Sequence, residues 1–505
     1  MAEFDGQSVT EFFTGRHVFI TGATGFLGSV LLEKLLRSCP KVNTVYVLVR
    51  GRKGKDAASR LMNLLQSPLF DRLKSEQGPD ALRKVVGVTG DVSSPDLGLN
   101  EADRRLLSST VSVVFHAAAT TNFNSTLEAA VRTNLLGTKS VLNLCREMER
   151  LVALVYVSTA FCNCTVRDVI SEQVYPSAWP PDHVVQAVQN EGEMAIRLVG
   201  GHPNTYSFTK QLAENVLQIE RGQLPIAIVR PSIVLGAWEE PAPGWVDNVP
   251  NGAYGFLAGA SKGVFRVAMA DPSMPADVIP CDLVANLLIV SAWSVAKDKE
   301  PGLQVFHATS GQRNPISWGE YIRAAIHAVR AHPCQTVLWY PGAKCRVHPW
   351  RVFIAMMLLQ IFPAFVLKGL SRKSGMLLPL QRRYWRGIQH VRYFTTRRWH
   401  FDLTCTNRLA ERLSPEDRAT FPFDAAEVHW PTCLERGALS MRVHFHNESP
   451  DTLPAARFNM AVWWWIHVIA HVCLLLLLSL MFAPLAGTST GFIIASVITL
   501  FFVWL

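Results

Sequence analysis

Short, nearly continuous apolar runs alternate with segments of helical periodicity through the first half of the chain. The clearest runs are residues 17–20, 41–50, 85–92, 111–119, 151–159 and 226–231. Strands that are apolar on both faces and separated by helices are typical of a parallel sheet covered on both sides. The pattern therefore predicts a doubly wound α/β domain of the Rossmann type. Residues 277–293 add another strand-to-helix transition, and the Pro- and Trp-containing segment 160–204 is expected to be irregular.

The composition changes after about residue 345. An apolar run at 352–367, interrupted by a proline, is too short for a confident membrane span and reads as interfacial or core. A basic stretch follows at 368–398, which is either a solvated face or a surface for lipid headgroups or the phosphates of a coenzyme A. We expect an N-terminal extension (1–14), a nucleotide- and substrate-binding region (15–345) and a mostly helical C-terminal domain (346–450).

The last part of the chain (458–505) is predicted to be a hydrophobic anchor. Residues 462–482 form an apolar run of about the length that spans a bilayer, with tryptophans at one end, as at a membrane interface. A second apolar run, 492–505, follows a break at 484–490. The pattern indicates a tail anchor or a membrane hairpin, with a buried core helix as the alternative.

A glycine-rich turn joins the first predicted strand to the first helix. Its candidate cofactor-binding residues are Thr21, Gly22, Thr24, Gly25, Phe26, Leu27 and Gly28. In such a turn Gly22 allows the tight bend, Gly25 the approach of a pyrophosphate, and Gly28 the packing of helix on strand. The pyrophosphate would lie at the helix N-terminus, where free N–H groups favour an anion. The G-x-x-G-x-x-G spacing is typical of short-chain dehydrogenases/reductases.

Two later strand ends supply further candidate cofactor contacts. Arg50 ends the second predicted strand, about twenty residues past the last glycine, and Arg52 follows it. An acid at this place would bind the ribose 2′-hydroxyl of NAD, whereas a base accommodates the 2′-phosphate of NADP, so NADPH is predicted. Asp91 and Val92 end the third strand, where Asp91 could accept a hydrogen bond from the adenine amino group.

The candidate catalytic residues are Tyr206, Lys210 and Thr159. Tyr206 and Lys210 are four apart at the start of a predicted helix and so face the same way. An ammonium beside a phenol stabilises the phenolate and makes the phenol a usable acid, and the same ammonium can bind the nicotinamide ribose. Thr159, at the end of the fifth strand, would hold the carbonyl oxygen of a substrate. The order of these motifs, rather than any one of them, makes the signal strong.

Charge and cysteine content limit the remaining possibilities. The formal charge of +9 is compatible with a membrane surface or an anionic substrate, and no basic cluster with interleaved aromatics suggests nucleic acid. Ten cysteines lie scattered without a C-x-x-C pair, which fits a reducing compartment. No metal site is predicted: His467 and His471 are four apart, but the clusters of a membrane metal oxygenase are missing.

The chain resembles the alcohol-forming fatty acyl-CoA reductases of animals and plants. The resemblance rests on the glycine turn, on Tyr206-Ser-Phe-Thr-Lys210, on residues 157–160 and 230–234, and on a C-terminal pattern at 399–430. It implies NADPH-dependent, four-electron reduction of a long-chain fatty acyl-CoA to a primary alcohol through a bound aldehyde. In the family such alcohols feed wax, ether-lipid, cuticular-lipid or pheromone synthesis.

With the tail as an anchor, the catalytic part is expected to face the cytosol, and both the endoplasmic reticulum and the peroxisome membrane are compatible with it. The fold is compatible with a homodimer. Two other functions stay open. One is a membrane-bound hydroxysteroid or sterol dehydrogenase, which would prefer NAD and an acid near position 50. The other is an inactive, membrane-tethered binding protein of the same fold, which would usually have lost the tyrosine, the lysine or the glycines.

Overall fold

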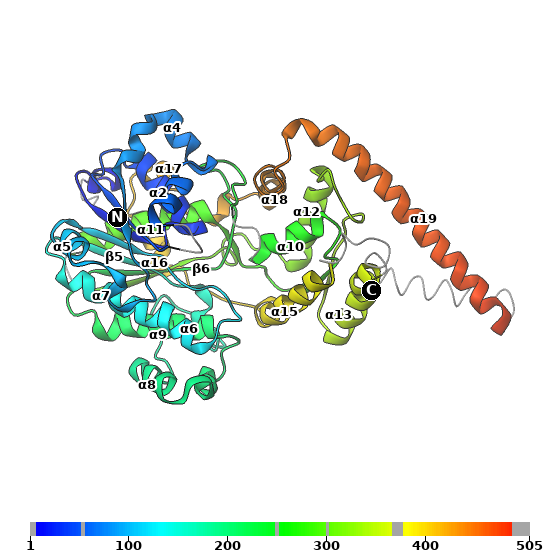
Figure 1. Ribbon diagram of the computed structural model, residues 1–505, viewed down its shortest axis with the longest axis horizontal. Coiled ribbons are helices and arrows are strands. Elements are labelled where there is room, and N and C mark those ends of the chain that lie inside the picture. Colours follow the sequence, from blue (N-terminus) through cyan, green and yellow to red (C-terminus); the bar gives the residue numbers. More distant parts are fainter. Residues whose placement is uncertain (1–6, 52–55, 248–251, 299–301, 366–376, 487–505) are drawn as a thin grey trace. The chain divides into compact units, whose positions relative to one another are not determined.

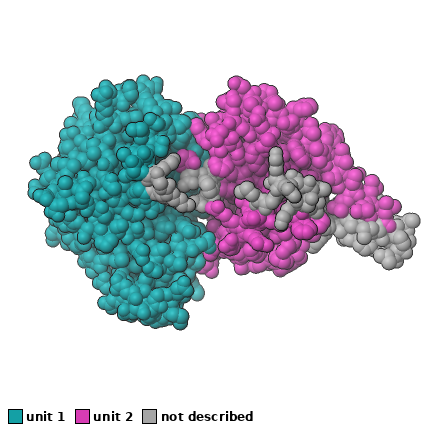
Figure 2. All heavy atoms as spheres, in the orientation of Figure 1, with its two compact units in different colours: residues 1–246, 277–315, 399–429 teal, residues 247–276, 316–398, 430–505 magenta. Residues whose placement is uncertain are grey.

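The computed structural model describes residues 7–51, 56–247, 252–298, 302–365 and 377–486, which form two compact units (Figures 1 and 2). Unit 1 comprises 1–246, 277–315 and 399–429, and unit 2 comprises 247–276, 316–398 and 430–505. This division differs from the contiguous domains predicted from the sequence. The chain leaves unit 1 after residue 246 and returns to it twice, so no single boundary near 345 separates the units.

Unit 1 contains the predicted parallel sheet, which confirms the doubly wound fold. Its strands lie in the order β10-β6-β5-β4-β1-β2-β3, and each pairs in parallel with its neighbour. Their bounds are β1 Val18–Thr21, β2 Val45–Val49, β3 Val85–Thr89, β4 Val113–His116, β5 Ala153–Val157, β6 Ile226–Pro231 and β10 Leu303–Ala308. The strand order reverses at β1, between β2 and β4, and ligands of such sheets bind beyond the carboxyl ends of the strands at this point.

Helices cover both faces of this sheet (Figure 1). Helix α2 (Phe26–Ser38) packs with α11 (Cys281–Lys297) on one face, and α7 (Gly137–Glu147) packs with α9 (Thr205–Glu220) on the other. β1, β2, β5 and β6 are buried along their whole length, which explains their continuous apolar sequences. The remaining helices of the unit are α1 Val9–Phe12, α3 Ala57–Leu65, α4 Asp71–Gln77, α5 Glu101–Thr110, α6 Leu127–Ala130, α8 Pro181–Glu191, α16 Thr404–Glu411 and α17 Pro415–Thr420.

Some elements of unit 1 differ from the prediction. The segment 160–204 was expected to be irregular but contains α8 and a 3₁₀ helix at Gly192–Val199. A π-helical stretch at Val131–Leu136 interrupts the helical segment between α6 and α7. A π-helical stretch of this kind is frequent at functional sites.

Unit 2 consists of helices around a small parallel sheet of two strands, β8 (Val267–Met269) and β11 (Lys344–Arg346). Its helices are α10 Gly252–Ser261, α12 Trp318–Ala331, α13 Pro349–Met356, α15 Leu377–Thr395, α18 Trp430–Ser440 and α19 Leu453–Ala486. The apolar run at 352–367 thus begins within α13, and α15 carries Arg382, Arg383, Arg386 and Arg392 of the basic stretch.

The predicted anchor begins in α19, which includes residues 462–482, whereas the second apolar run lies outside the described residues. Across the helices that the structure describes, none is both long and apolar enough to cross a bilayer.

A buried ion pair in unit 1 joins strand β6 to helix α9. Arg230 of β6 donates to both carboxylate oxygens of Glu214 of α9, at 2.9 and 2.6 Å, and both side chains are fully buried. The Arg230 guanidinium also donates to the carbonyl oxygens of Ser171 and Gln173. The pair therefore fixes α9, β6 and the segment that follows β5 against one another.

We expect Arg230→Met to lower the free energy of unfolding by about 3–5 kcal/mol, because it leaves the Glu214 carboxylate buried without its partner. The double variant Arg230→Met/Glu214→Met should lose less than the single variant, because no charge is left unpaired. Urea unfolding followed by circular dichroism would measure both values. Equal losses in the two variants would contradict this role of the ion pair.

Candidate dinucleotide and catalytic site

The glycine turn between β1 and α2 is packed too closely for side chains at two of its three glycines. Gly22 has a φ of +79°, and a Cβ there would lie 2.6 Å from the Ala118 backbone nitrogen. A Cβ on Gly28 would lie 2.2 Å from the Gly22 carbonyl oxygen. At Gly25 the closest atom would be the same oxygen, at 3.2 Å, and this residue is exposed. Gly22 and Gly28 therefore serve the packing of the turn, and Gly25 leaves its outer side open.

The first turn of α2 offers free backbone donors beside that open side. Gly25 is the N-cap residue of α2, and no side chain caps the helix there. The uncapped N–H groups and the helix dipole favour a bound anion such as a pyrophosphate. Phe26 and Leu27 are partly exposed at this end. The turn thus fits the phosphates of a dinucleotide, as the sequence predicts.

The two threonines of the turn make different contacts. Thr21 is fully buried, and its hydroxyl lies 2.7 Å from Nδ1 of His116 at the end of β4. Burial and the charge of Lys210 lower the pKa of His116 to about 3, so this histidine is neutral and ties β1 to β4. Thr24 is only partly buried and accepts a hydrogen bond from Arg60 of α3 at 3.2 Å.

Two arginines meet at the carboxyl end of β2. Arg50 is half-exposed, and its Nη1 lies 3.6 Å from the Asp91 carboxylate at the end of β3. Arg60 donates to the Arg50 carbonyl oxygen and to Thr24. The other oxygen of Asp91 accepts from the backbone and the hydroxyl of Ser93. Sequence reasoning missed Arg60, because it lies within the polar helical insertion rather than at a strand end.

The structure says less about two other predicted cofactor-binding residues, Val92 and Arg52. Val92 is buried beside Gly137, where an added Cβ would lie 2.7 Å from the Val92 carbonyl oxygen. Arg52 lies outside the described residues.

Lys210 is buried one helical turn beyond Tyr206 in α9. Its ammonium donates to the Val157 carbonyl oxygen at 2.7 Å and to the Tyr156 hydroxyl at 3.2 Å. Burial lowers the pKa of Lys210 to about 7, although the nearby Glu214 carboxylate raises it in part. A lysine with this pKa can exchange a proton near neutral pH.

The Thr159 hydroxyl is a neighbour of the Tyr206 phenol. Burial raises the pKa of Tyr206, and the Thr159 hydroxyl opposes this effect only in part. The phenol is therefore protonated at neutral pH and can donate its proton. Thr159 is buried, and its oxygen also accepts from the Phe161 backbone N–H at 3.3 Å. The structure thus brings together the three residues that the sequence predicted as catalytic.

Asn134 is a further residue of this site that the sequence did not single out as functional. It lies in the π-helical stretch, where its Oδ1 accepts from the Thr120 backbone N–H at 2.8 Å. Its Nδ2 donates to the Thr209 hydroxyl at 3.0 Å, and Thr209 precedes Lys210 in α9. Asn134 therefore holds the start of α9 against the loop after β4. The feature that points to Asn134 is the π-helical break in the helix, which is visible in the structure but not in the sequence pattern.

Comparisons with known proteins agree with this geometry. An NAD-binding family model described as "Male sterility protein" matches residues 20–288, and a second model with the same description matches residues 356–448. The rat protein "Fatty acyl-CoA reductase 1" is 36% identical over 466 residues, covering 90% of this chain and 89% of the relative. The human protein of that name is 36% identical over 462 residues, with the same coverage.

Solved structures show the same fold at lower identity. The terminal reductase domain of the myxalamid biosynthetic pathway has a TM-score of 0.55 at 20% identity, over 86% of this chain and 91% of that one. The reductase domain of a nonribosomal peptide synthetase from Mycobacterium tuberculosis has a TM-score of 0.56 at 19% identity, over 86% and 92%. These structures show the fold, and the NAD-binding family model together with the glycine turn supports a nicotinamide dinucleotide as the cofactor.

Substitution by alanine can distinguish the role of Gly25 in cofactor binding from the role of Gly28 in packing. Gly25→Ala needs only a few tenths of an ångström of adjustment, so we expect a nearly unchanged melting temperature. Its methyl group would stand where the pyrophosphate approaches, and dinucleotide affinity should fall at least about tenfold. Gly28→Ala should instead lower the melting temperature, because its methyl meets backbone. Thermal melts and fluorescence titration with dinucleotide would measure both, and equal behaviour of the variants would contradict this assignment.

Proposed function

The chain belongs to the fatty acyl-CoA reductase family, and from that premise we propose that it reduces long-chain fatty acyl-CoA to a primary alcohol with NADPH. The reaction would use two hydride transfers and release free coenzyme A. The observation that carries the proposal is that a protonated Tyr206 has the Thr159 hydroxyl as a neighbour and lies one helical turn from the buried Lys210. Such a group can polarise a carbonyl and then protonate the oxygen that results.

Cofactor binding would use the residues already described around the switch point of the sheet. The first turn of α2 would hold the pyrophosphate, and Arg50 with Arg60 would face the 2′-phosphate of the adenosine ribose. The nicotinamide dinucleotide supplies the hydride. Among the described residues, the one ion pair of the Arg50 guanidinium is a long contact with Asp91, so it can turn to a phosphate at little cost. This arrangement supports NADPH over NADH.

In the first half of the reaction the thioester carbonyl oxygen would accept hydrogen bonds from Thr159 and Tyr206. These donors stabilise the negative charge that develops on the oxygen as hydride reaches the carbonyl carbon. The tetrahedral oxyanion that results, the hemithioacetal in its deprotonated form, re-forms its carbon–oxygen double bond as the carbon–sulfur bond breaks, and coenzyme A leaves as the thiolate. The product of this half is an aldehyde that stays in the site.

In the second half the aldehyde oxygen would take the proton of Tyr206 as the second hydride arrives at carbon. The phenolate that forms is stabilised by the ammonium of Lys210 on the same helix face. Because the pKa of Lys210 is about 7, proton exchange with solvent can restore the phenol after each transfer. The fatty alcohol would supply wax, ether-lipid, cuticular-lipid or pheromone synthesis.

The proposal also includes a place of action. The acyl chain and the alcohol both partition into membranes, so an enzyme held at a membrane works where they are. The exposed apolar side chains of α19, among them Trp465, Leu476 and Leu480, support attachment through the C-terminal segment. The catalytic unit would face the cytosol at the endoplasmic reticulum or peroxisome, as a monomer or homodimer. Alkaline extraction of membranes and the mass of the solubilised protein test these two points.

The other functions considered from the sequence have less support. A sterol dehydrogenase would not explain relatives that are fatty acyl-CoA reductases over nine-tenths of the chain. An inactive binding protein would not need a Tyr206 that contacts Thr159 beside a lysine whose pKa is about 7.

The experiment that tests the reaction is NADPH consumption by the detergent-solubilised chain with palmitoyl-CoA, with extraction of the lipid products. We expect two NADPH oxidised for each hexadecanol. Tyr206→Phe should lower turnover about 10²- to 10⁴-fold, the contribution of a general acid, and leave NADPH binding intact. Aldehyde as the sole product would restrict the activity to the first reduction. Absence of turnover with acyl-CoA of any length, with NADPH still bound, would overturn the proposal.

The Arg50→Ala variant tests the preference for NADPH over NADH. Loss of a charge-assisted hydrogen bond to a phosphate costs about 1.5–3 kcal/mol, so the dissociation constant for NADPH should rise about 10- to 100-fold. The constant for NADH, which has no 2′-phosphate, should change little. Fluorescence titration of both dinucleotides would measure this. A parallel loss for both would show that Arg50 does not read the 2′-phosphate.

A further inference from the structure

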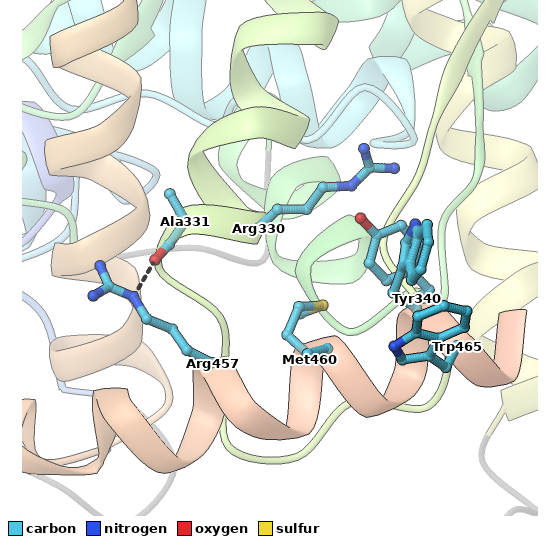
Figure 3. A pocket seen from close by; sticks show the side chains of 8 residues that line it. Arg330, Ala331, Tyr340, Arg457, Met460 and Trp465 are labelled. Carbon is cyan, nitrogen blue, oxygen red and sulfur yellow. Dashed lines mark hydrogen bonds between the residues drawn. The ribbon is translucent and has the colours of Figure 1, made fainter. Parts of the chain in front are cut away.

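Unit 2 has an open pocket of about 490 Å³ between α12 and α19 (Figure 3). Its lining residues are Arg330, Ala331, Tyr340, Arg457, Met460, Ala461, Trp464 and Trp465. Arg330 and Ala331 end α12, Tyr340 lies in the loop before β11, and the others follow one side of the first half of α19. In Figure 3 the guanidinium groups of Arg330 and Arg457 lie on either side of the pocket.

Both arginines are held by backbone carbonyls rather than by acids. Arg330 donates to the Pro341 carbonyl oxygen from Nε and Nη2, at 2.9 and 2.7 Å, and lies over the Tyr340 ring at 4.5 Å. Arg457 donates from Nε to the Ala331 carbonyl oxygen at 3.0 Å. Within the described part of the chain neither forms an ion pair with a carboxylate. The positive charge at the pocket is therefore uncompensated.

A third arginine increases this excess of charge. A Cβ on Gly342 would lie 3.4 Å from Nη2 of Arg330 and 3.8 Å from Nη2 of Arg266, so the two guanidinium groups converge there. The buried Nε of Arg266 has no hydrogen-bond partner among the described residues. Burial and the charges of Arg330 and Arg346 lower the pKa of Arg266 to about 10. Such a cluster is stabilised by an anion.

The surroundings of the pocket show what kind of anion fits. Trp464 and Trp465 are exposed on α19, and Ile466, Ile469 and Leu476 continue the exposed apolar surface along the helix. Tryptophan and tyrosine beside such a surface are typical of the boundary between membrane and water. A ligand that satisfies both parts has a negatively charged head and an apolar body.

We propose that this pocket binds the headgroup of an anionic phospholipid, with its phosphate at Arg330 and Arg457 and its glycerol and acyl part along Trp464 and Trp465. The site would select the lipid surface on which unit 2 rests. It does not depend on the reductase reaction, because every residue involved belongs to unit 2, whereas Tyr206, Lys210 and Thr159 belong to unit 1.

The test is a titration of the full chain, in micelles of a non-ionic detergent, with fluorescently labelled phosphatidylserine and with labelled phosphatidylcholine. We expect tighter binding of phosphatidylserine, weakened by salt because the attraction is partly screened. A basic residue near an anionic lipid surface contributes about 1 kcal/mol, so Arg330→Gln and Arg457→Gln should each weaken binding about fivefold. The double variant should weaken it about 25-fold and leave phosphatidylcholine unaffected.

Matched controls separate this site from general basic charge. Arg323→Gln removes an exposed arginine earlier in α12, and Arg382→Gln/Arg383→Gln removes two from α15. Both should bind phosphatidylserine like the unchanged chain. Arg330→Lys/Arg457→Lys keeps the charge and should retain most of the affinity. Palmitoyl-CoA reduction and thermal melts report whether each variant is folded.

Three results would overturn the proposal. One is undiminished phosphatidylserine binding by the double glutamine variant. Another is loss of binding in the α15 variant instead, which would assign the lipid to the basic helix. The third is equal affinity of the unchanged chain for the two lipids. None of these results would affect the reductase assay, so failure of this proposal and failure of the proposed function can be told apart.

Discussion

Helix α9, which carries the predicted catalytic residues Tyr206 and Lys210, depends on the buried ion pair between Glu214 and Arg230. Glu214 lies one turn beyond Lys210, so the ion pair that anchors α9 to β6 also fixes the position of Lys210 relative to the sheet. The Glu214 carboxylate also accepts from the Cys162 thiol at 3.2 Å, in the turn that follows Thr159. One carboxylate thus helps to hold two of the three residues predicted to be catalytic, and its charge keeps the Lys210 pKa from falling further.

The same network reaches a distant part of the chain. Arg230 donates from Nη1 to Nε2 of His307 at 3.2 Å, and burial together with Arg230 lowers the pKa of His307 to about 3. The neutral ring then carries its proton on Nδ1 and donates to the Asp402 carbonyl oxygen at 2.7 Å. Glu172 adds to this link, accepting from the backbone N–H of His307 and Thr406. Segment 399–429 is therefore part of unit 1, although residues 316–398 of unit 2 separate it from the preceding segment of unit 1, 277–315.

Local patterns predicted most of this unit, and contacts between distant segments account for what they missed. The apolar strands, the glycine turn, and the Tyr206 and Lys210 pair are each specified within a few neighbouring residues. β10 was not predicted, because Gln304 and His307 interrupt its apolar sequence and are paired only in the fold. The return of segment 399–429 to the sheet depends on the ring packing of Trp399 and Phe401 on Phe161, at 5.6 and 5.7 Å, which no local periodicity encodes.

The catalytic site was easier to predict than the means by which it is positioned. Tyr206 and Lys210 are recognisable because their spacing follows from helix geometry alone. Asn134 acts through an amide that contacts Thr120 and Thr209, and the π-helical stretch that aims it has no sequence signature. Burial is the main cause of the lowered pKa of Lys210, and a carboxylate from its own helix opposes this effect in part. In this chain the reacting groups are local in sequence, whereas the polar network that tunes and orients them forms only when the sheet is assembled.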